Sequence, residues 1–383
     1  MAEPRIRLGM VGGGRGAFIG AVHRIAARID DKYELVAGAL SSTPENAKAS
    51  AADLLLDPAR SYASYEEMFQ AESQREDGIE AVAIVTPNHM HFPVAKAALE
   101  AGIHVICDKP VTRTLEEALE LQKIARASDR FFALTHNYSA YPLVRQAREM
   151  VARGDLGNIR LIQVEYPQEW LTEAPEADNK QATWRTDPAR SGKAGCLGDI
   201  GTHAFQLARF ITDLKLESVS ADLTAFVPGR PVDDNVHAML RFEKGAKGML
   251  WTSQVAPGCE NGLRIRVYGD KAGLDWAQEN PNELWFTPLG GYHQRLTRRD
   301  DNLDSDIAVR GIRTPSGHPE GYLEAFATLY SDVAEVLQAR RHGKQCDIES
   351  WIPGIDTGVE GLQFVSAVLA SSEEEGRWTP LGQ

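Results

Sequence analysis

Three kinds of feature are scarce or missing in this sequence of 383 residues. It has only four cysteines, Cys107, Cys196, Cys259 and Cys346, and no C-x-x-C pair. This spacing argues against a zinc cage or a disulfide framework and fits a reducing cytosol. No apolar run approaches the ~20 residues that a membrane-spanning helix needs, and the first residues lack the pattern of a secretory signal. We therefore expect a cytoplasmic protein with no membrane partner.

Positively charged residues are also fewer than negatively charged ones. The 41 Lys and Arg residues face 54 Asp and Glu residues, which gives a net charge of −13. Nucleic-acid-binding proteins usually present a basic face, so no nucleic-acid partner is expected. Hydrophobic residues make up 43% and charged residues 25%, which is ordinary globular usage and excludes a largely disordered chain. At about 150 residues per domain, the length predicts two or three domains.

The first part of the chain alternates short apolar runs with longer amphipathic ones. Hydrophobic strands that alternate with helices predict a parallel sheet covered on both faces. Thr43 and Pro44 mark the start of one helix, and Gly102 marks the end of another. The expected strands are 6–11, 34–40, 81–85, 104–107 and 131–135, and the expected helices are 17–29, 44–54, 93–101 and 115–128.

The pattern then changes to longer strand-like runs joined by short turns. Such connections predict a mainly antiparallel sheet. The expected strands here are 160–166, 218–226, 235–242, 248–254 and 263–268, and the expected helices are 141–153, 199–211, 322–340 and 356–371. The predicted fold class is therefore α/β, with a doubly wound parallel sheet in a domain of residues 1–137 and a larger, mainly antiparallel sheet in a domain of residues 138–383.

A glycine-rich turn follows the first predicted strand and opens the first predicted helix. Residues 12–17 read Gly-Gly-Gly-Arg-Gly-Ala and fit G-x-G-x-x-G/A. In this context the glycines let the backbone approach a pyrophosphate, and the helix N-terminus supplies N–H groups and positive potential. We therefore expect the first domain to be a Rossmann domain that binds a dinucleotide.

The end of the second predicted strand bears on the type of dinucleotide. NAD sites usually carry an acid there, which binds the ribose hydroxyls. This sequence has Ser41 and Ser42 instead, with no acid and no arginine beside them for the 2′-phosphate of NADP. We expect NAD, with NADP not excluded.

Polar residues follow two further strands, where ligands bind in open α/β sheets. Residues 86–91 read Thr-Pro-Asn-His-Met-His, residues 107–110 read Cys-Asp-Lys-Pro, and residues 198–203 read Gly-Asp-Ile-Gly-Thr-His. Asp199 and His203, four residues apart, share a helical face. His89 and His91 could share a face of a strand, but no further Cys or His cluster accompanies them, so no metal is expected.

Taken together and in this order, these motifs resemble the Gfo/Idh/MocA family over nearly the whole chain. The resemblance implies a Rossmann domain followed by an α/β domain whose open-faced sheet mediates homodimers or homotetramers. It implies hydride transfer between a nicotinamide and a sugar or polyol carbon. The sequence departs from the family at Asp108, where a Glu is usual, and at residues 136–139, His-Asn-Tyr-Ser, where Asn-Arg-Arg-Phe is common.

The resemblance places Lys109, Asp199 and His203 at catalytic positions. A histidine near neutral pKa suits removal of the hydroxyl proton, and a lysine ammonium stabilises a developing alkoxide. We therefore assign His203 as the base and Lys109 as its electrostatic partner, with an exchange of the two roles left open. Asp199 would orient His203 or bind a neighbouring hydroxyl, although its place at a helix start equally suits an N-cap. The expected cofactor-binding residues are Gly12, Gly14, Arg15, Ala17, Ser41, Ser42, Thr86, Pro87, Asn88, His91, Asp108, Lys109 and Asn137.

The substrate pocket is harder to define. Trp170 and Trp184 flank a polar stretch, and aromatic faces stack well against sugar rings. The candidate substrate-binding residues are Lys109, Tyr138, Gln168, Trp184, Arg185, Asp199, His203 and His318. The pair Asp233-Asp234 is most simply a solvated turn. Four basic residues at positions 180, 185, 190 and 193 leave an anionic substrate, such as a sulfonated sugar glycoside, open.

Two further functions remain open. Some members of such a family are NAD-dependent glycoside hydrolases that oxidise a ring hydroxyl transiently, eliminate the leaving group, add water and return the hydride. This reaction uses the same first step, so the motifs do not separate it from a dehydrogenase. A non-catalytic redox sensor or scaffold is the third possibility, and the presence of both Lys109 and His203 argues against it.

Overall fold

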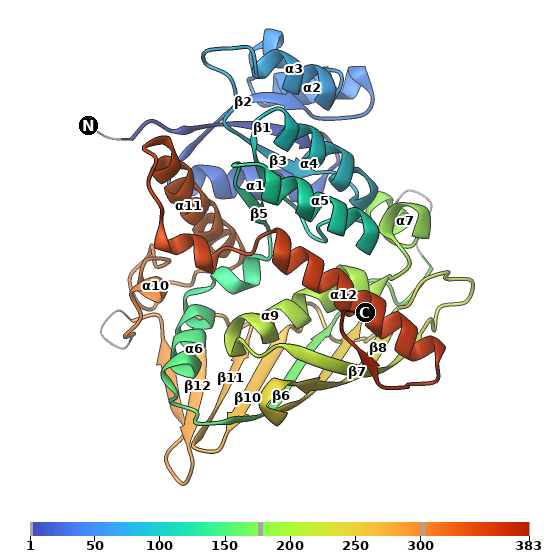
Figure 1. The fold of residues 1–383 in the computed structure, drawn as a ribbon, viewed down its shortest axis with the longest axis vertical. Helices are drawn as coiled ribbons and strands as arrows, with labels where there is room; N and C mark the ends of the chain where they lie inside the picture. The colour runs from blue at the N-terminus through green and yellow to red at the C-terminus, as the bar shows by residue number, and fades with distance from the viewer. Residues whose placement is uncertain (1–2, 175–178, 300–302, 383) are drawn as a thin grey trace. The chain divides into compact units, whose positions relative to one another are not determined.

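The computed structural model describes residues 3–174, 179–299 and 303–382 of the chain. Its contacts divide the chain into two compact units. The first unit comprises residues 1–136 and 326–359, and the second comprises residues 137–325 and 360–383. Figure 1 follows the chain from blue to red.

The first unit is built on a five-stranded parallel sheet with the order β2-β1-β3-β4-β5. Its central strand, β3, is wholly apolar and every one of its residues is buried, as a parallel strand covered on both faces requires. The strands are β1 (Ile6–Gly12), β2 (Tyr33–Ala39), β3 (Ala81–Val85), β4 (His104–Cys107) and β5 (Phe132–Leu134). The helices between them are α1 (Phe18–Ile29), α2 (Pro44–Asp53), α3 (Tyr65–Glu72), α4 (His91–Glu100) and α5 (Leu115–Ala127).

The strand order fixes where a ligand can bind in this unit. The chain leaves β1 toward β2 on one side and returns to β3 on the other, so the order reverses between β1 and β3. Ligands of open α/β sheets bind beyond the carboxyl ends of the strands at such a point. Gly12 at the end of β1 pairs with Val85 at the end of β3, which brings the glycine-rich turn beside the loop that begins at Thr86.

The second unit contains a nine-stranded sheet with the order β13-β12-β11-β10-β6-β9-β8-β7-β14. All neighbours are antiparallel except β6 and β9, which are parallel. The strands are β6 (Ile159–Pro167), β7 (Leu216–Thr224), β8 (Asn235–Phe242), β9 (Lys247–Ser253), β10 (Arg264–Gly269), β11 (Ala272–Ala277), β12 (Glu283–Pro288), β13 (Gln294–Thr297) and β14 (Thr379–Pro380).

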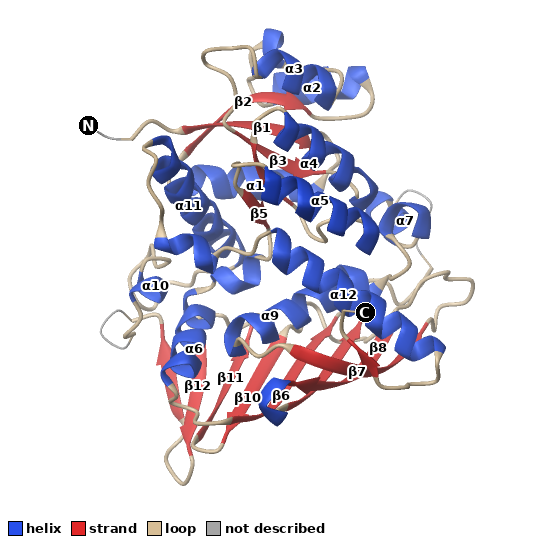
Figure 2. Ribbon diagram, viewed as in Figure 1, coloured by secondary structure: helices blue, strands red, loops and turns tan. Residues whose placement is uncertain are grey.

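One face of this sheet is covered by helices, as Figure 2 shows for α6 (Pro142–Arg153) and α9 (Thr202–Thr212). Buried and exposed residues alternate along β8, which is the pattern of a strand with one covered face. Three short helices precede α9: α7 (Lys180–Arg185), α8 (Pro188–Ser191) and a single π-helical turn, η4 (Leu197–Gly201). The other helices are α10 (Asp306–Val309), α11 (Tyr322–Arg341) and α12 (Ile355–Glu373).

The predicted α/β class, with a parallel sheet followed by a mainly antiparallel one, is confirmed. Helix α3 and the strands β11, β12 and β13 lie outside the expected set. The structure also differs from a single boundary after residue 137, because residues 326–359 pack on the first unit. Tyr330 hydrogen-bonds His23 of α1 at 2.8 Å, and the Pro353 carbonyl accepts a hydrogen bond from the Leu134 amide at 2.7 Å. Within the described part of the chain, no helix is long and apolar enough to span a membrane.

Candidate active site

The glycine-rich turn has a shape that only glycine allows. Gly12 and Gly13 have positive φ angles of 80° and 73°. A Cβ on Gly14 would lie 2.6 Å from both the Leu40 carbonyl oxygen and Ser50 Oγ, and a Cβ on Gly20 would lie 2.4 Å from Gly13 Cα. Helix α1 therefore packs closely on the turn. Its N-terminus carries no side-chain cap, since Ala17 at the N-cap supplies no hydrogen bond. These features fit a dinucleotide pyrophosphate.

The end of β2 lies beside this turn. The Gly14 amide donates to the Leu40 carbonyl at 3.1 Å, which ties the turn to the chain just before Ser41 and Ser42. Ser41 Oγ accepts hydrogen bonds from the Thr43 amide and from Asn46 Nδ2 at 3.2 and 3.1 Å. Ser41 therefore stabilises the entry into α2, and Ser42 is exposed at the same strand end.

His91 joins the two loops that follow β3 and β4. It is fully buried, and its Nδ1 and Nε2 lie 2.7 and 2.9 Å from the carbonyl oxygens of Pro110 and Thr86. Burial lowers the pKa of this imidazole. With both ring nitrogens at backbone oxygens, His91 positions the loop that carries Lys109 rather than offering a nitrogen to a cofactor. Thr86 Oγ1 is buried and has no hydrogen-bond partner among the described residues.

Asp108 and His136 lie near Lys109 in the first unit. Burial alone would raise the pKa of Asp108, but His23, Lys109 and the Thr135 hydroxyl at 2.7 Å together hold it well below its usual range. Asp108 is therefore a carboxylate, like the Glu it replaces. Burial, with the Lys109 charge, lowers the pKa of His136 to about 3, so this imidazole is neutral at physiological pH.

In the second unit, Asp199 lies in the π-helical turn η4 and not at an N-cap. Its amide donates to the Gly195 carbonyl at 2.9 Å, so the chain is already helical before it. Its Oδ2 accepts a hydrogen bond from Gln254 Nε2 at 2.9 Å and lies 3.3 Å from Arg185 Nε. π-helical turns occur frequently at functional sites. The N-cap interpretation of Asp199 is therefore wrong, and its carboxylate is held by two side chains.

His203 follows one turn later, on α9, against a wall of tyrosines. The ring of Tyr138 meets it edge to face with centroids 4.8 Å apart, and the ring of Tyr166 lies 6.5 Å away. The hydroxyls of Tyr138 and Tyr166 are hydrogen-bonded to each other at 2.6 Å, and burial raises the pKa of both. The two phenols thus stay protonated and fix the imidazole ring in place.

Arg185 and two tryptophans form an aromatic and cationic patch next to Asp199. The Arg185 guanidinium lies 4.4 Å from the ring centroid of Trp184 and 5.8 Å from that of Trp170. The same guanidinium pairs with Asp199. The charge of Arg185 is thus balanced within the protein. The side chain of Lys180, named with it in the sequence, lies outside the described residues.

Gln168 belongs to a chain of hydrogen bonds that could not be predicted from the sequence. Gln168 Nε2 donates to Asn261 Oδ1 at 2.9 Å, and the same oxygen accepts from the Tyr166 hydroxyl at 2.7 Å. Trp170 Nε1 donates to Gln168 Oε1 at 3.0 Å. The contributors come from β6 and from two separate loops, so only the folded sheet brings them together with His203.

The interpretation of Asp233-Asp234 as a solvated turn is wrong. Both residues are buried. Asp233 accepts hydrogen bonds from the amides of Gly195 and Leu197, each at 2.7 Å, and so anchors the segment that leads to Asp199. Asp234 accepts hydrogen bonds from the Phe226 and Val227 amides and pairs with Arg230. Burial raises the pKa of Asp233 to about 6.

Two remaining candidates have simpler surroundings. Asn137 is buried at the start of a short 3₁₀ helix, η3 (Asn137–Ala140). His318 is exposed, and its Nδ1 lies 3.2 Å from the Pro315 carbonyl oxygen of its own loop. Over the described residues, no group of three or more His, Cys, Asp or Glu side chains could hold a metal ion.

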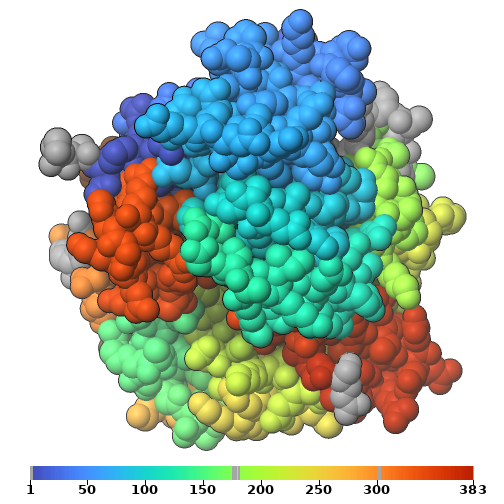
Figure 3. Space-filling model, turned by 45° about the horizontal axis from the view of Figure 1, so that its top comes forward, coloured from blue at the N-terminus to red at the C-terminus, as the bar shows by residue number. Residues whose placement is uncertain are grey.

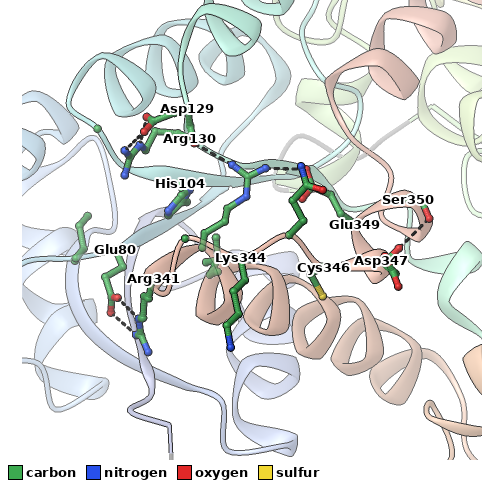
Figure 4. A pocket seen from close by; sticks show the side chains of 16 residues that line it. Glu80, His104, Asp129, Arg130, Arg341, Lys344, Cys346, Asp347, Glu349 and Ser350 are labelled. Carbon is green, nitrogen blue, oxygen red and sulfur yellow. Dashed lines mark hydrogen bonds and ion pairs between the residues drawn. The ribbon is translucent and has the colours of Figure 1, made fainter.

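A cavity of about 1050 Å³ in the first unit lies at the wrong end of the sheet for this chemistry. Its lining includes Glu80 and His104, which lie at the amino ends of β3 and β4 (Figure 4). Two arginines of the cavity wall are paired with carboxylates: Arg341 with Glu80, and Arg340 with Glu349. The charges of these side chains are therefore balanced within the protein. The surface of residues near 340–350 lies next to that of residues near 130 in Figure 3.

Comparison with known proteins agrees with this geometry. Residues 6–136 match the oxidoreductase family with an NAD-binding Rossmann fold, and residues 144–275 match the GFO/IDH/MocA C-terminal domain. An uncharacterized oxidoreductase of Bacillus subtilis, YfiI, is 35% identical over 378 residues, covering 97% of this chain and 96% of its own. The chain belongs to the Gfo/Idh/MocA family of oxidoreductases.

Solved structures of relatives cover almost the whole chain. An oxidoreductase from Sinorhizobium meliloti is 55% identical with a TM-score of 0.90, covering 98% of this chain and 99% of its own. An inositol dehydrogenase homologue from Azotobacter vinelandii, solved with NAD⁺, is 38% identical with a TM-score of 0.93. The match covers 98% of this chain and 97% of the homologue. The Gfo/Idh/MocA assignment, the NAD-binding Rossmann fold and the oxidoreductase class predicted from the motifs are thus confirmed.

Proposed function

We propose that this protein oxidises a secondary hydroxyl of a sugar, glycoside or cyclitol with NAD. The observation that carries the proposal is the Asp199–His203 arrangement, in which a fixed carboxylate and a fixed imidazole share one face of a helix beside a tryptophan-lined patch. The named relatives support the substrate class. A levoglucosan dehydrogenase from Pseudarthrobacter phenanthrenivorans is 29% identical over 340 residues, and the inositol dehydrogenase homologue was also solved with NADH and myo-inositol.

The residues proposed to hold the cofactor belong to the first unit, except Asn137, which belongs to the second. Gly12, Gly14, Arg15 and Ala17 form the pyrophosphate turn. Ser41 and Ser42 lie at the ribose end, and Thr86, Pro87, Asn88, Asp108, Lys109 and Asn137 complete the proposed set, with His91 positioning two of its loops. When bound, the nicotinamide accepts a hydride from the substrate carbon.

The protein's own residues handle the proton and the charge. An imidazole nitrogen of His203 takes the proton from the substrate hydroxyl. The Lys109 ammonium stabilises the negative charge that develops on that oxygen. Asp199 accepts a hydrogen bond from a neighbouring hydroxyl and is held by its ion pair with Arg185. Trp184 offers a ring face to the sugar, and Tyr138, Gln168 and His318 are further candidate contacts.

The first test is turnover, followed by absorbance at 340 nm with NAD and a panel of cyclitols, free sugars and glycosides. NADH formed in proportion to an oxidised product supports the proposal. Arg185→Gln should weaken turnover of the active substrate, because Asp199 loses a partner and Trp184 loses its stacked cation. Arg295→Gln is the matched control, since this arginine of the same unit is also paired with a carboxylate, that of Glu283, and has no place in the proposed site. No NAD reduction and no product with any compound would contradict the proposal.

The same assay distinguishes a dehydrogenase from an NAD-dependent glycoside hydrolase. Such an enzyme cleaves a glycoside only when NAD is present and leaves no net NADH. It also needs a further acid or base, which Tyr138, His136 or a carboxylate of the second domain would have to supply, and the first two suit this role poorly. Burial raises the pKa of Tyr138, and burial lowers the pKa of His136 to about 3. Paired neutral and anionic glycosides in the panel test the anionic alternative; the balanced charge of Arg185 favours a neutral substrate.

We further propose that the uncovered face of the large sheet mediates a homodimer or homotetramer. Four large apolar side chains on it are 38–57% exposed: Leu161, Met239, Met249 and Tyr268. Met239 pairs with Met249, and Leu161 with Tyr268, across neighbouring strands, so they form two exposed apolar pairs, which together are called a stripe. Such a stripe is typical of an interface. Light scattering should report an oligomer that Met239→Lys/Met249→Lys dissociates and Leu55→Lys, on the first unit, does not.

A further inference from the structure

The glycine-rich turn carries one charged side chain, Arg15, and the structure shows what holds it. Arg15 Nε and Nη2 lie 2.5 and 2.7 Å from the two carboxylate oxygens of Asp53, the last residue of α2. This is the bidentate geometry in which a guanidinium binds a carboxylate or a phosphate. Both side chains are about half exposed, so the pair lies within reach of a ligand in solution.

The backbone places Arg15 next to the connection between β2 and α2. The Arg15 amide donates to Ser50 Oγ of α2 at 3.0 Å, and the preceding residue, Gly14, donates to the Leu40 carbonyl at the end of β2. The ribose of a dinucleotide lies at this strand end. Arg15 therefore lies beside the strand end where a ribose 2′-phosphate would bind, although it precedes Ser41 by 26 residues in the sequence.

We propose that Asp53 is a specificity-determining residue that favours NAD over NADP by occupying Arg15. The inference rests on the proposed dinucleotide site and adds the reason for its preference. Asp53 acts in two ways. It takes the two guanidinium nitrogens that would grip a 2′-phosphate, and it puts a carboxylate charge close to where that phosphate would lie. The sequence shows neither effect, because residues 15 and 53 lie 38 positions apart and come together only where the glycine-rich turn contacts α2.

Direct binding tests this without relying on turnover. The dissociation constants of NAD⁺ and NADP⁺ are measured by calorimetry for the wild type, Asp53→Asn, Arg15→Gln and the double variant. Asp53→Asn should tighten NADP⁺ binding at least ~10-fold while changing NAD⁺ binding little, because a charge-assisted contact to the phosphate becomes available. The double variant should lose this gain, and the gain should shrink at high salt.

The controls separate this inference from its foundation. Glu34→Gln removes one negative charge at the amino end of β2 and should leave the NAD⁺/NADP⁺ ratio unchanged. Equal tightening of both dinucleotides by Asp53→Asn, or a gain that survives in the double variant, would overturn the role of the pair while leaving the dinucleotide site intact. Failure of the wild type to bind either dinucleotide would instead overturn the proposed function.

Discussion

The two units build their parts of the proposed site in different ways. In the first unit the backbone shapes the site. Gly12 and Gly13 have positive φ angles, the N-terminus of α1 has no side-chain cap, and His91 contacts carbonyl oxygens of two loops at strand ends. In the second unit side chains shape the site. Asp199 is held by Gln254 and Arg185, and His203 by a tyrosine wall whose hydroxyls bond onward to Asn261.

This difference matches what each part must recognise. A pyrophosphate is the same in every dinucleotide, so a backbone cradle serves it without side-chain choice. Hydroxyl stereochemistry differs from one sugar to the next, and only placed side chains can read it. We therefore expect backbone changes in the first unit to affect cofactor binding, and side-chain changes in the second unit to affect turnover.

The largest effect is expected at His203. His203→Ala removes the proposed base, and positioned general bases contribute about 10²–10⁴-fold. Turnover should fall at least ~100-fold, with NAD⁺ binding nearly unchanged. Steady-state rates and calorimetry measure the two quantities. His293→Ala, an exposed histidine stacked on Trp285 of the same unit, is the matched control. Turnover that survives in His203→Ala would remove the residue from the mechanism.

The next effect concerns the buried anchor Asp233. Burial, reinforced by Asp234 and opposed by two backbone N–H groups, raises its pKa from about 3.9 to about 6. The native state then binds this proton more tightly than the unfolded state. The stabilisation is fully present below about pH 4 and is lost as the pH rises through about 6, a change of about 3 kcal/mol. Urea unfolding at pH 4, 5, 6 and 7 should show this decline in the wild type relative to Asp233→Asn. Parallel pH profiles for the two proteins would contradict it.

A smaller effect is expected from Gly14→Ala. The new Cβ would lie 2.6 Å from the Leu40 carbonyl oxygen, a backbone atom that cannot move away cheaply. Overpacking of this kind costs about 1–3 kcal/mol, and we expect a rise of roughly tenfold in the NAD⁺ dissociation constant. Gly361→Ala in α12, where a Cβ would meet nothing within 4 Å, is the control. Unchanged NAD⁺ affinity in Gly14→Ala would argue against the backbone cradle.

The smallest expected effect is on stability, through the N-caps of two helices of the first unit. Thr114 caps α5 through a capping box with Glu117, whereas Thr43 stands at the N-cap of α2 without a side-chain hydrogen bond. Thr114→Ala should lower the free energy of unfolding by about 1 kcal/mol, and Thr43→Ala by clearly less. Urea titration compares the two. Equal losses would mean that threonine at these positions acts through something other than the cap.

The contrast between a backbone site and a side-chain site also explains which features could be predicted from the sequence. The glycine turn, the strand-end motifs and the change from parallel to antiparallel strands are local patterns, and the structure has them where they were expected. The partners of Asp199 and His203 were not predictable in this way. Gln254 and Asn261 are polar residues in loops more than 50 positions beyond them in the chain, and nothing in the local sequence distinguishes them from solvated residues. The same holds for Asp233, whose burial depends on the segment at Gly195 packing over it.

The return of residues 326–359 to the first unit has a consequence for how the protein is made. A ribosome releases the chain from its N-terminus, and domains made of one continuous stretch fold as they emerge. Here all five parallel strands are synthesised by residue 134, but the segment that bonds to His23 and Leu134 ends only at Val359. By then eight of the nine strands of the second sheet have been translated. The cofactor-binding unit, first in the gene, is thus among the last parts of the molecule to be completed during translation.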